Sequence, residues 1–206
     1  PSLFYNHVMK KTFFTNELFS FLTELGANND REWFNDNKIR YIEHAREPML
    51  NFIEALGKPL LNISEHYIAD PKVNGGSMFR IYRDTRFSKN KTPYKTHISI
   101  QLRHEAGRDA HAPGFYLQLK PGGCMLGGGI YRGDNVALGK IRDRIVNKTD
   151  EWLALQRDDT FNQTFGQIVG DGLKRVPRGF DKEHPCAEDL KRKTLFIRHE
   201  FDDELA

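Results

Sequence analysis

Residues 78–103 read MFRIYRDTRFSKNKTPYKTHISIQLR, and in this stretch the spacing of apolar residues changes from about four to two. At its end, Ile98, Ile100 and Leu102 alternate with polar residues. Residues 78–83 and 115–120 alternate in the same way. Because successive side chains of a strand point to opposite faces, this pattern is typical of antiparallel strands with one covered face. It predicts strands over these three segments.

The residues before this stretch favour helices. Apolar side chains recur at helical spacing within residues 15–26, which predicts one helix there. A second helix is predicted to begin near Asn29 and a third at Pro48, because proline suits the first turn of a helix. The third is predicted to break near residues 57–59, which include a glycine and a proline.

The residues after the predicted strands return to helical spacing. Asp134 is suited to cap a helix, Thr149 to open a second, and residues 187–191 to form a short third one. A final strand is predicted over 194–201. Helices followed by strands and then by helices indicate an α+β fold, in which N-terminal and C-terminal helices cover an antiparallel or mixed sheet.

Length and composition limit the class of protein. The chain has 206 residues, of which 38% are hydrophobic, so it is able to bury a core. We interpret residues 13–201 as a single domain, residues 1–12 as an N-terminal extension that is disordered, and residues 202–206 as an acidic tail. No stretch is long and apolar enough to span a bilayer, which favours a cytoplasmic protein without a membrane partner.

Metal and cofactor motifs are absent from the sequence. Cys124 and Cys186 have no CxxC companion, and the histidines show no metal-ligand spacing. The glycines over 122–131 match no nucleotide-binding pattern, and close strand packing explains them better than a phosphate site. His97 is open to two interpretations, a proton shuttle near neutral pH or a hydrogen-bonded residue at a strand edge. We predict no metal and no cofactor.

The net charge of +3 conceals two basic segments. Residues 80–97 hold six cations and one acid, a net charge of +5, and residues 173–198 have a net charge of +4. The remainder of the chain is therefore acidic, with a net charge of −6. Such crowding of cations costs self-repulsion unless an anion binds there, although a solvated basic loop is the simpler alternative.

Aromatic residues are interleaved with the cations of the first basic segment. On a strand, Arg80, Tyr82 and Asp84 would share one face. Arginine presents paired donors that match phosphate or carboxylate, and lysine adds a point charge. Asp84 is expected to stay ionised and to orient the arginines, since neighbouring cations lower the pKa of a carboxyl group. A structural ion-pair network is an equally good interpretation of this residue.

The same segment carries a family resemblance. The pattern RxxRDxRFxxNKxxY over residues 80–94 resembles the hallmark of a bacterial family of uncharacterised proteins, domain of unknown function 2461. Further similar stretches are NNDREWF at 28–34, GGGIY at 127–131 and LKRxPRGF at 173–180. The resemblance covers most of residues 13–197. It implies no established activity.

Three functions follow from these residues as hypotheses. The first is a protein, and in one version an enzyme, whose pocket binds a phosphorylated or other anionic small molecule, with Arg178 folding back beside Arg80 and Arg83. The second is nucleic-acid binding by the same basic and aromatic surface. The third is an interaction module without a ligand. The sequence assigns no catalytic residue, reaction or oligomeric state. The candidate ligand-binding residues are Arg80, Tyr82, Arg83, Asp84, Arg86, Lys91, Tyr94, Lys95 and Arg178.

Overall fold

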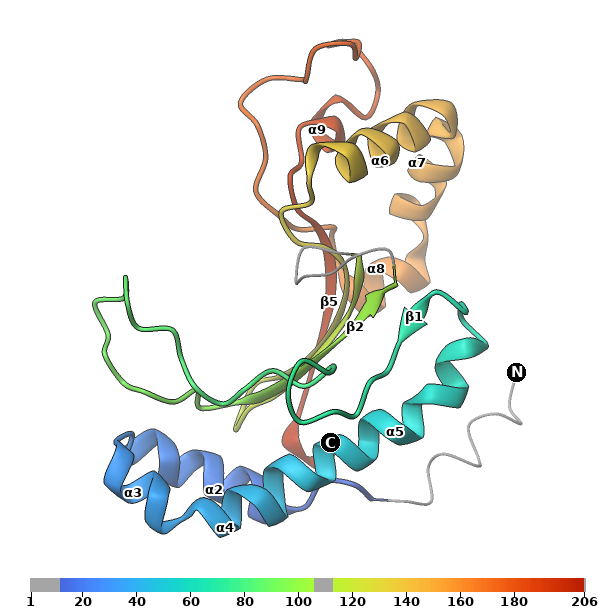
Figure 1. Ribbon diagram of the computed structural model, residues 1–206. Helices are drawn as coiled ribbons and strands as arrows, with labels where there is room; N and C mark the ends of the chain where they lie inside the picture. Colours follow the sequence, from blue (N-terminus) through green and yellow to red (C-terminus); the bar gives the residue numbers. More distant parts are fainter. Residues whose placement is uncertain (1–11, 106–112, 206) are drawn as a thin grey trace. The chain divides into compact units, whose positions relative to one another are not determined.

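The computed structural model describes residues 12–105 and 113–205, and it has an α+β fold (Figure 1). Five strands form one antiparallel sheet in the order β1-β2-β3-β4-β5, so each strand pairs with its neighbours in the sequence. This confirms the predicted fold class. The strands are β1 (Tyr67–Ile68), β2 (Ile98–His104), β3 (Gly114–Leu119), β4 (Cys124–Ile130) and β5 (Leu195–Phe201).

The chain divides into two compact units. The first comprises the residues up to Leu102, Leu117–Met125 and the residues from Glu200 onward. The second comprises Arg103–Tyr116 and Leu126–His199. Neither unit is continuous in the sequence. The single domain over residues 13–201 stays a prediction, and residues 1–11 of the predicted extension lie outside the described residues.

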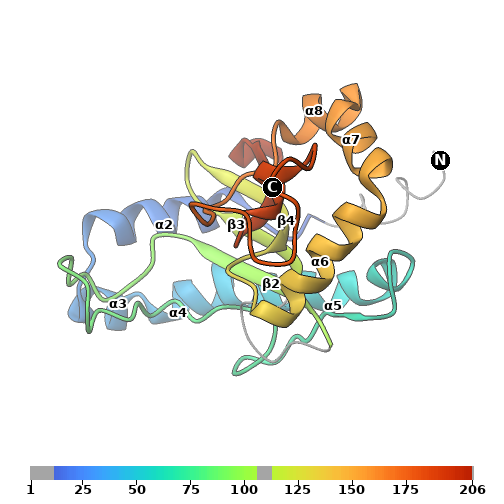
Figure 2. The ribbon, with the colours of Figure 1, turned by 90° about the horizontal axis from the view of Figure 1, so that it is seen from above.

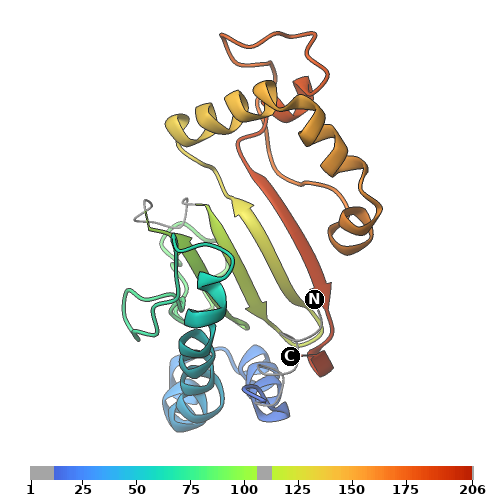
Figure 3. The same cartoon turned by 90° about the vertical axis from the view of Figure 1, so that its right-hand side faces the viewer.

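Helices of the first unit follow one another almost without interruption. They are α2 (Asn16–Ala27), α3 (Arg31–Asp36), α4 (Lys38–Tyr41), the π-helical turn η1 (Ile42–Arg46) and α5 (Glu47–Leu61). Figure 3 shows α2 lying beside the run from α3 to α5. The first three predicted elements are therefore present, with a one-turn π-helix where the second passes into the third.

The predicted break near residues 57–59 is wrong, because α5 continues to Leu61. Its buried stripe runs from Met49 through Ile53 to Leu60. Burial of this stripe outweighs the cost of about 1 kcal/mol for a helical glycine. Pro59 lacks the N–H for one helical hydrogen bond, and its ring crowds the preceding turn, but the helix continues for two residues and buries Leu60.

The predicted strand over 78–83 does not form as a regular strand. Met78 pairs with Ile100, and Tyr82 pairs with Tyr94, in isolated antiparallel bridges. Four residue steps separate Met78 from Tyr82, whereas six separate Tyr94 from Ile100. The two extra residues on the returning side interrupt the ladder, as a bulge does.

Helices of the second unit are α6 (Asn135–Asn147), α7 (Thr149–Arg157), α8 (Asp159–Phe165) and α9 (Ala187–Leu190) (Figure 2). The Asp134 side chain caps α6 by accepting a hydrogen bond of 2.7 Å from the backbone N–H of Ala137, as predicted. Three of these helices were expected from the sequence.

Helix α8 was not predicted, although the sequence holds a signal for it. The Asp158 carboxylate accepts a hydrogen bond of 2.7 Å from the backbone N–H of Phe161 and so caps the helix. The helix is short and buries no residue completely. Apolar spacing therefore does not reveal it, and the capping residue alone marks its start.

Candidate functional site

The first basic segment forms an irregular two-stranded structure over residues 79–97, which we call the basic ribbon. The backbone N–H of Phe79 donates to the carbonyl of Ser99 over 2.9 Å. The N–H of Lys95 donates to Ile81, and that of Arg83 donates to Pro93, each over 2.8 Å. These bonds tie the outgoing and returning halves together. The whole ribbon belongs to the first unit.

An aromatic platform supports the base of the ribbon. Phe34 of α3 is 1% exposed, and its ring stacks on Tyr94 with a centroid distance of 4.0 Å and an interplanar angle of 18°. Tyr82 packs against both rings, at centroid distances of 6.2 Å from Phe34 and 5.4 Å from Tyr94. Tyr94 is buried, whereas Tyr82 is 50% exposed. The platform thus contacts the Tyr82 ring and leaves part of it to solvent.

Asn29 fixes the returning half of the ribbon to the helices. Its side-chain amide donates 3.1 Å to the carbonyl of Tyr94, and its side-chain oxygen accepts from the N–H of Tyr94 over 3.0 Å. Asp30, the next residue, caps α3 by accepting from Trp33 N–H over 2.9 Å. Sequence patterns miss the role of Asn29 because its partner is 65 residues away.

Several ribbon cations are held by uncharged oxygen atoms. Arg83 Nη1 donates to the hydroxyl and, over 3.2 Å, to the carbonyl of Thr92. Lys91 Nζ donates to the carbonyl of Thr85 over 2.9 Å, and Lys95 Nζ donates to that of Arg80 over the same distance. A carbonyl oxygen positions a cation without neutralising it. The charges of these side chains therefore remain available to an anion.

The charge of Arg80 also acts on Lys95. Burial, and then the neighbouring charge of Arg80, lower the pKa of Lys95. Both effects disfavour the charged form of the lysine. An anion placed beside the two side chains would relieve this repulsion, as the sequence analysis anticipated for the segment.

Within the described ranges, the arginine that pairs with Asp84 is Arg86. Its carboxylate accepts from Arg86 Nη2 at 2.7 Å and from Arg86 Nε at 3.0 Å. Hydrogen bonds from Arg86, and then its charge, lower the pKa of Asp84 to about 2. The carboxyl group therefore stays ionised at neutral pH. It orients Arg86, and the described interactions give it no bond to Arg80 or Arg83.

Aromatic exposure is greatest at the tip of the ribbon. Phe87 is 94% exposed, and the guanidinium carbon of Arg86 lies 5.8 Å from its ring centroid. Apart from this contact the ring faces solvent, where a partner can reach it. The ribbon thus carries two accessible rings, Tyr82 near its base and Phe87 at its tip, with cations between them.

The burial of His97 argues against one of its two interpretations. Desolvation, and then the charges of Lys95 and Lys120, lower the pKa of His97 to about 4. A proton shuttle near neutral pH needs a pKa closer to 7. His97 is therefore neutral under such conditions and suits a structural role.

We expect acid to destabilise the protein through His97. Above pH 6.5 the imidazole is neutral in both states, so its contribution is fully present there. As the pH falls from 6.5 to about 4, the unfolded state takes up the proton first, and the free energy of unfolding should drop by roughly 2 kcal/mol after allowance for solvent screening. Urea denaturation of the wild type and of His97→Gln across this range measures the effect. The expectation is contradicted if the free energy of unfolding changes with pH equally in the two proteins.

Most of the predicted site residues lie on the basic ribbon, where they bind separate partners. Arg83 is bound to Thr92, and Arg86 is bound to Asp84. Arg178 belongs to the second unit, so its approach to Arg80 stays a prediction. Sequence reasoning assigned no role to Thr92, and it did not recognise Phe34 as the base of the platform.

The glycine-rich stretch serves close packing, as the sequence favoured. A Cβ on Gly127 or Gly129 would overlap strand β5, at Phe196 and Leu195 respectively. Only glycine lets β4 approach its neighbour so closely. Both cysteines are buried and free, and burial raises the pKa of each thiol, which makes them poor nucleophiles.

The described ranges, 12–105 and 113–205, hold neither a metal-binding cluster nor a membrane-spanning helix. They contain no group of three or more histidine, cysteine or acidic side chains arranged to hold a metal ion. They also contain no helix whose length and apolar character would let it cross a bilayer.

Comparison with known proteins gave one match. A family model described as "Conserved hypothetical protein (DUF2461)" matches residues 17–206, which is nearly the whole chain. No curated protein and no solved structure matches the chain.

Proposed function

We propose that the basic ribbon of this chain, which belongs to the DUF2461 family, binds nucleic acid. Membership of the family assigns the chain no activity. One observation carries the proposal. Two accessible aromatic rings, Tyr82 and Phe87, lie on the same ribbon as cations that are held by neutral oxygen atoms. Phosphates would meet the cations, and bases would stack on the rings.

The spread of the cations supports a chain of phosphates over a single one. A pocket for a small anion needs its guanidinium groups to converge on one point. On the ribbon, Arg83 is directed to Thr92 and Arg86 to Asp84, while Lys91 reaches the carbonyl of Thr85. Cations held at separate points suit the repeated charges of a polynucleotide backbone. The first hypothesis from the sequence was binding of a phosphorylated small molecule. The following experiments distinguish it from nucleic-acid binding.

Loss of both rings is expected to weaken binding about 30-fold. A stacked base contributes about 1–3 kcal/mol, and the lower value for each of two rings gives about 2 kcal/mol. Fluorescence anisotropy of a labelled 20-nucleotide oligonucleotide, titrated with wild type and with the double variant Tyr82→Ala, Phe87→Ala, measures this loss. Tyr131→Ala removes a ring that is 55% exposed in the second unit and serves as the matched control.

Two results would contradict the proposal. One is that the double variant and the control variant bind the oligonucleotide with the same affinity. The other is a melting temperature that rises with mononucleotides or sugar phosphates while the wild type shows no affinity for the oligonucleotide at low salt. The second result would favour the small-ligand hypothesis.

A further inference from the structure

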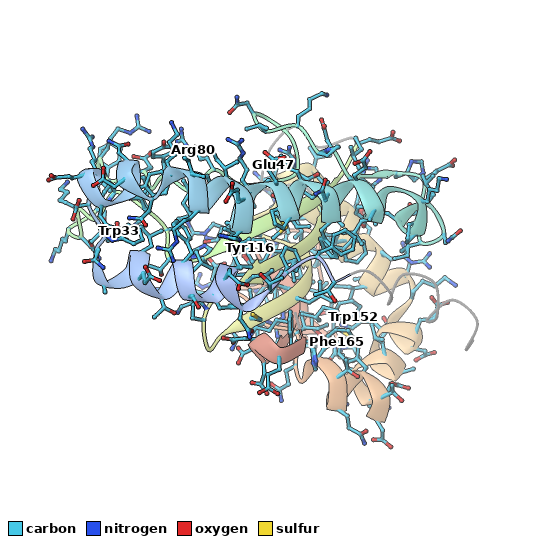
Figure 4. All side chains as sticks on the ribbon, turned by 90° about the horizontal axis from the view of Figure 1, so that it is seen from below. Trp33, Glu47, Arg80, Tyr116, Trp152 and Phe165 are labelled. Carbon is cyan, nitrogen blue, oxygen red and sulfur yellow. The ribbon has the colours of Figure 1, made fainter. Side chains whose placement is uncertain are left out.

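A hollow lies between helices α6 and α7 of the second unit, and its volume is about 380 Å³. Trp152, on α7, is labelled in Figure 4. This volume falls within the range of pockets that hold small ligands, about 300–1,000 Å³. The hollow is lined by Lys140, Ile141, Arg144, Ile145, Lys148, Glu151, Trp152 and Leu155.

The floor of the hollow is apolar and fixed in place. Ile145 is 2% exposed and belongs to the core of the unit, together with Ile141 and Trp152. The indole N–H of Trp152 donates to Asp189 Oδ2 over 2.9 Å, which fixes its ring. Leu155 is 42% exposed, so part of this apolar surface faces solvent. An apolar ligand would cover it and release water.

Cations line one wall of the hollow. Lys140 and Arg144 lie four residues apart on one face of α6, and Lys148 follows directly as the residue that ends the helix. Glu151 bonds Lys148 at 2.7 Å and Arg144 at 3.5 Å. No ion pair is found for Lys140 within the described part of the chain. The lining therefore has a net charge of +2 beside an apolar floor.

We propose that this hollow binds a single-chain amphiphile with an anionic headgroup, such as a medium-chain carboxylate. The chain would lie on Ile141, Trp152 and Leu155, and the headgroup would meet Lys140 and Arg144. The size of the site selects this ligand over a protein partner. Eight lining residues fall well below the 20–30 per side that a stable protein interface uses. The inference does not depend on the function of the basic ribbon.

Trp152 provides a direct probe of the hollow. The chain has two tryptophans, so Trp33→Phe leaves Trp152 as the only source of indole fluorescence. In this background, sodium decanoate below its micellar concentration should shift the emission saturably, whereas decanol and decylammonium should bind more weakly. The double variant Lys140→Glu, Arg144→Glu should weaken decanoate binding at least tenfold.

Lys174→Glu, Lys182→Glu makes the same change of charge at exposed positions of the second unit and should leave decanoate binding unchanged. Leu155→Asp, which alters the exposed edge of the floor, serves as a second test if the circular dichroism of the first double variant is not that of a folded protein. The proposal is overturned if the emission shows no saturable change, or if decanoate and decanol bind with equal affinity. It is also overturned if decanoate binding survives both the charge-reversing double variant of the hollow and Leu155→Asp.

Discussion

Replacement of Phe34 by alanine is expected to lower the free energy of unfolding by about 3–5 kcal/mol, the usual cost of removing a buried phenylalanine. Phe34 is 1% exposed and stacks on Tyr94 at 4.0 Å. Its ring also lies 5.4 Å from Tyr41 and 6.2 Å from Tyr82. The substitution would therefore open a cavity below the ribbon as well as remove apolar contact. Urea denaturation followed by circular dichroism measures the change.

Phe87→Ala is the matched control, because it removes the same side chain at a position that is 94% exposed. Its effect on stability should remain within about 0.5 kcal/mol. A loss of less than 1 kcal/mol for Phe34→Ala would show that the ring does not support the fold as described.

The triple variant Arg80→Gln, Lys89→Gln, Lys91→Gln is expected to weaken oligonucleotide binding roughly 100-fold at about 0.1 M salt. Each phosphate contact to a single strand releases about 0.7 counterion, which corresponds to roughly fivefold in affinity at this salt concentration. All three side chains are exposed, so the fold should be preserved. Titration of the labelled oligonucleotide by anisotropy measures the loss.

The matched control removes three cations outside the ribbon, by Arg157→Gln, Lys174→Gln and Lys182→Gln. These exposed residues lie in the second unit, and the net charge falls by the same amount. Binding should fall less than threefold. Equal losses for the two triple variants would mean that total charge, and no particular surface, attracts the oligonucleotide.

The sequence predicted those parts of the fold that depend on local patterns. Alternation over residues 98–103 and 115–120 predicted β2 and β3, and Asp134 predicted the start of α6. One failure arose where pairing over a distance decides the structure. The strand predicted over residues 78–83 is interrupted because the returning half of the ribbon has two extra residues. The alternation within residues 78–83 cannot reveal this mismatch.

The candidate site shows the same division. Clustering of cations along the sequence identified the basic ribbon, since charge density is a local property. The sequence could not show which oxygen atoms hold those cations, because the contact of Arg83 with Thr92 requires the ribbon to fold back. For the same reason, it could not show that Tyr82 rests on a stack of Phe34 and Tyr94.

Salt dependence of oligonucleotide binding tests the central claim most directly, namely that ribbon cations contact phosphates. The logarithm of the association constant is plotted against that of the salt concentration for the wild type and for Arg80→Gln, Lys89→Gln, Lys91→Gln. The wild type should give a steep negative slope, and the variant a slope shallower by about 2, which is roughly 0.7 for each lost contact. A wild-type affinity that does not change with salt, or identical slopes for both proteins, would contradict the account.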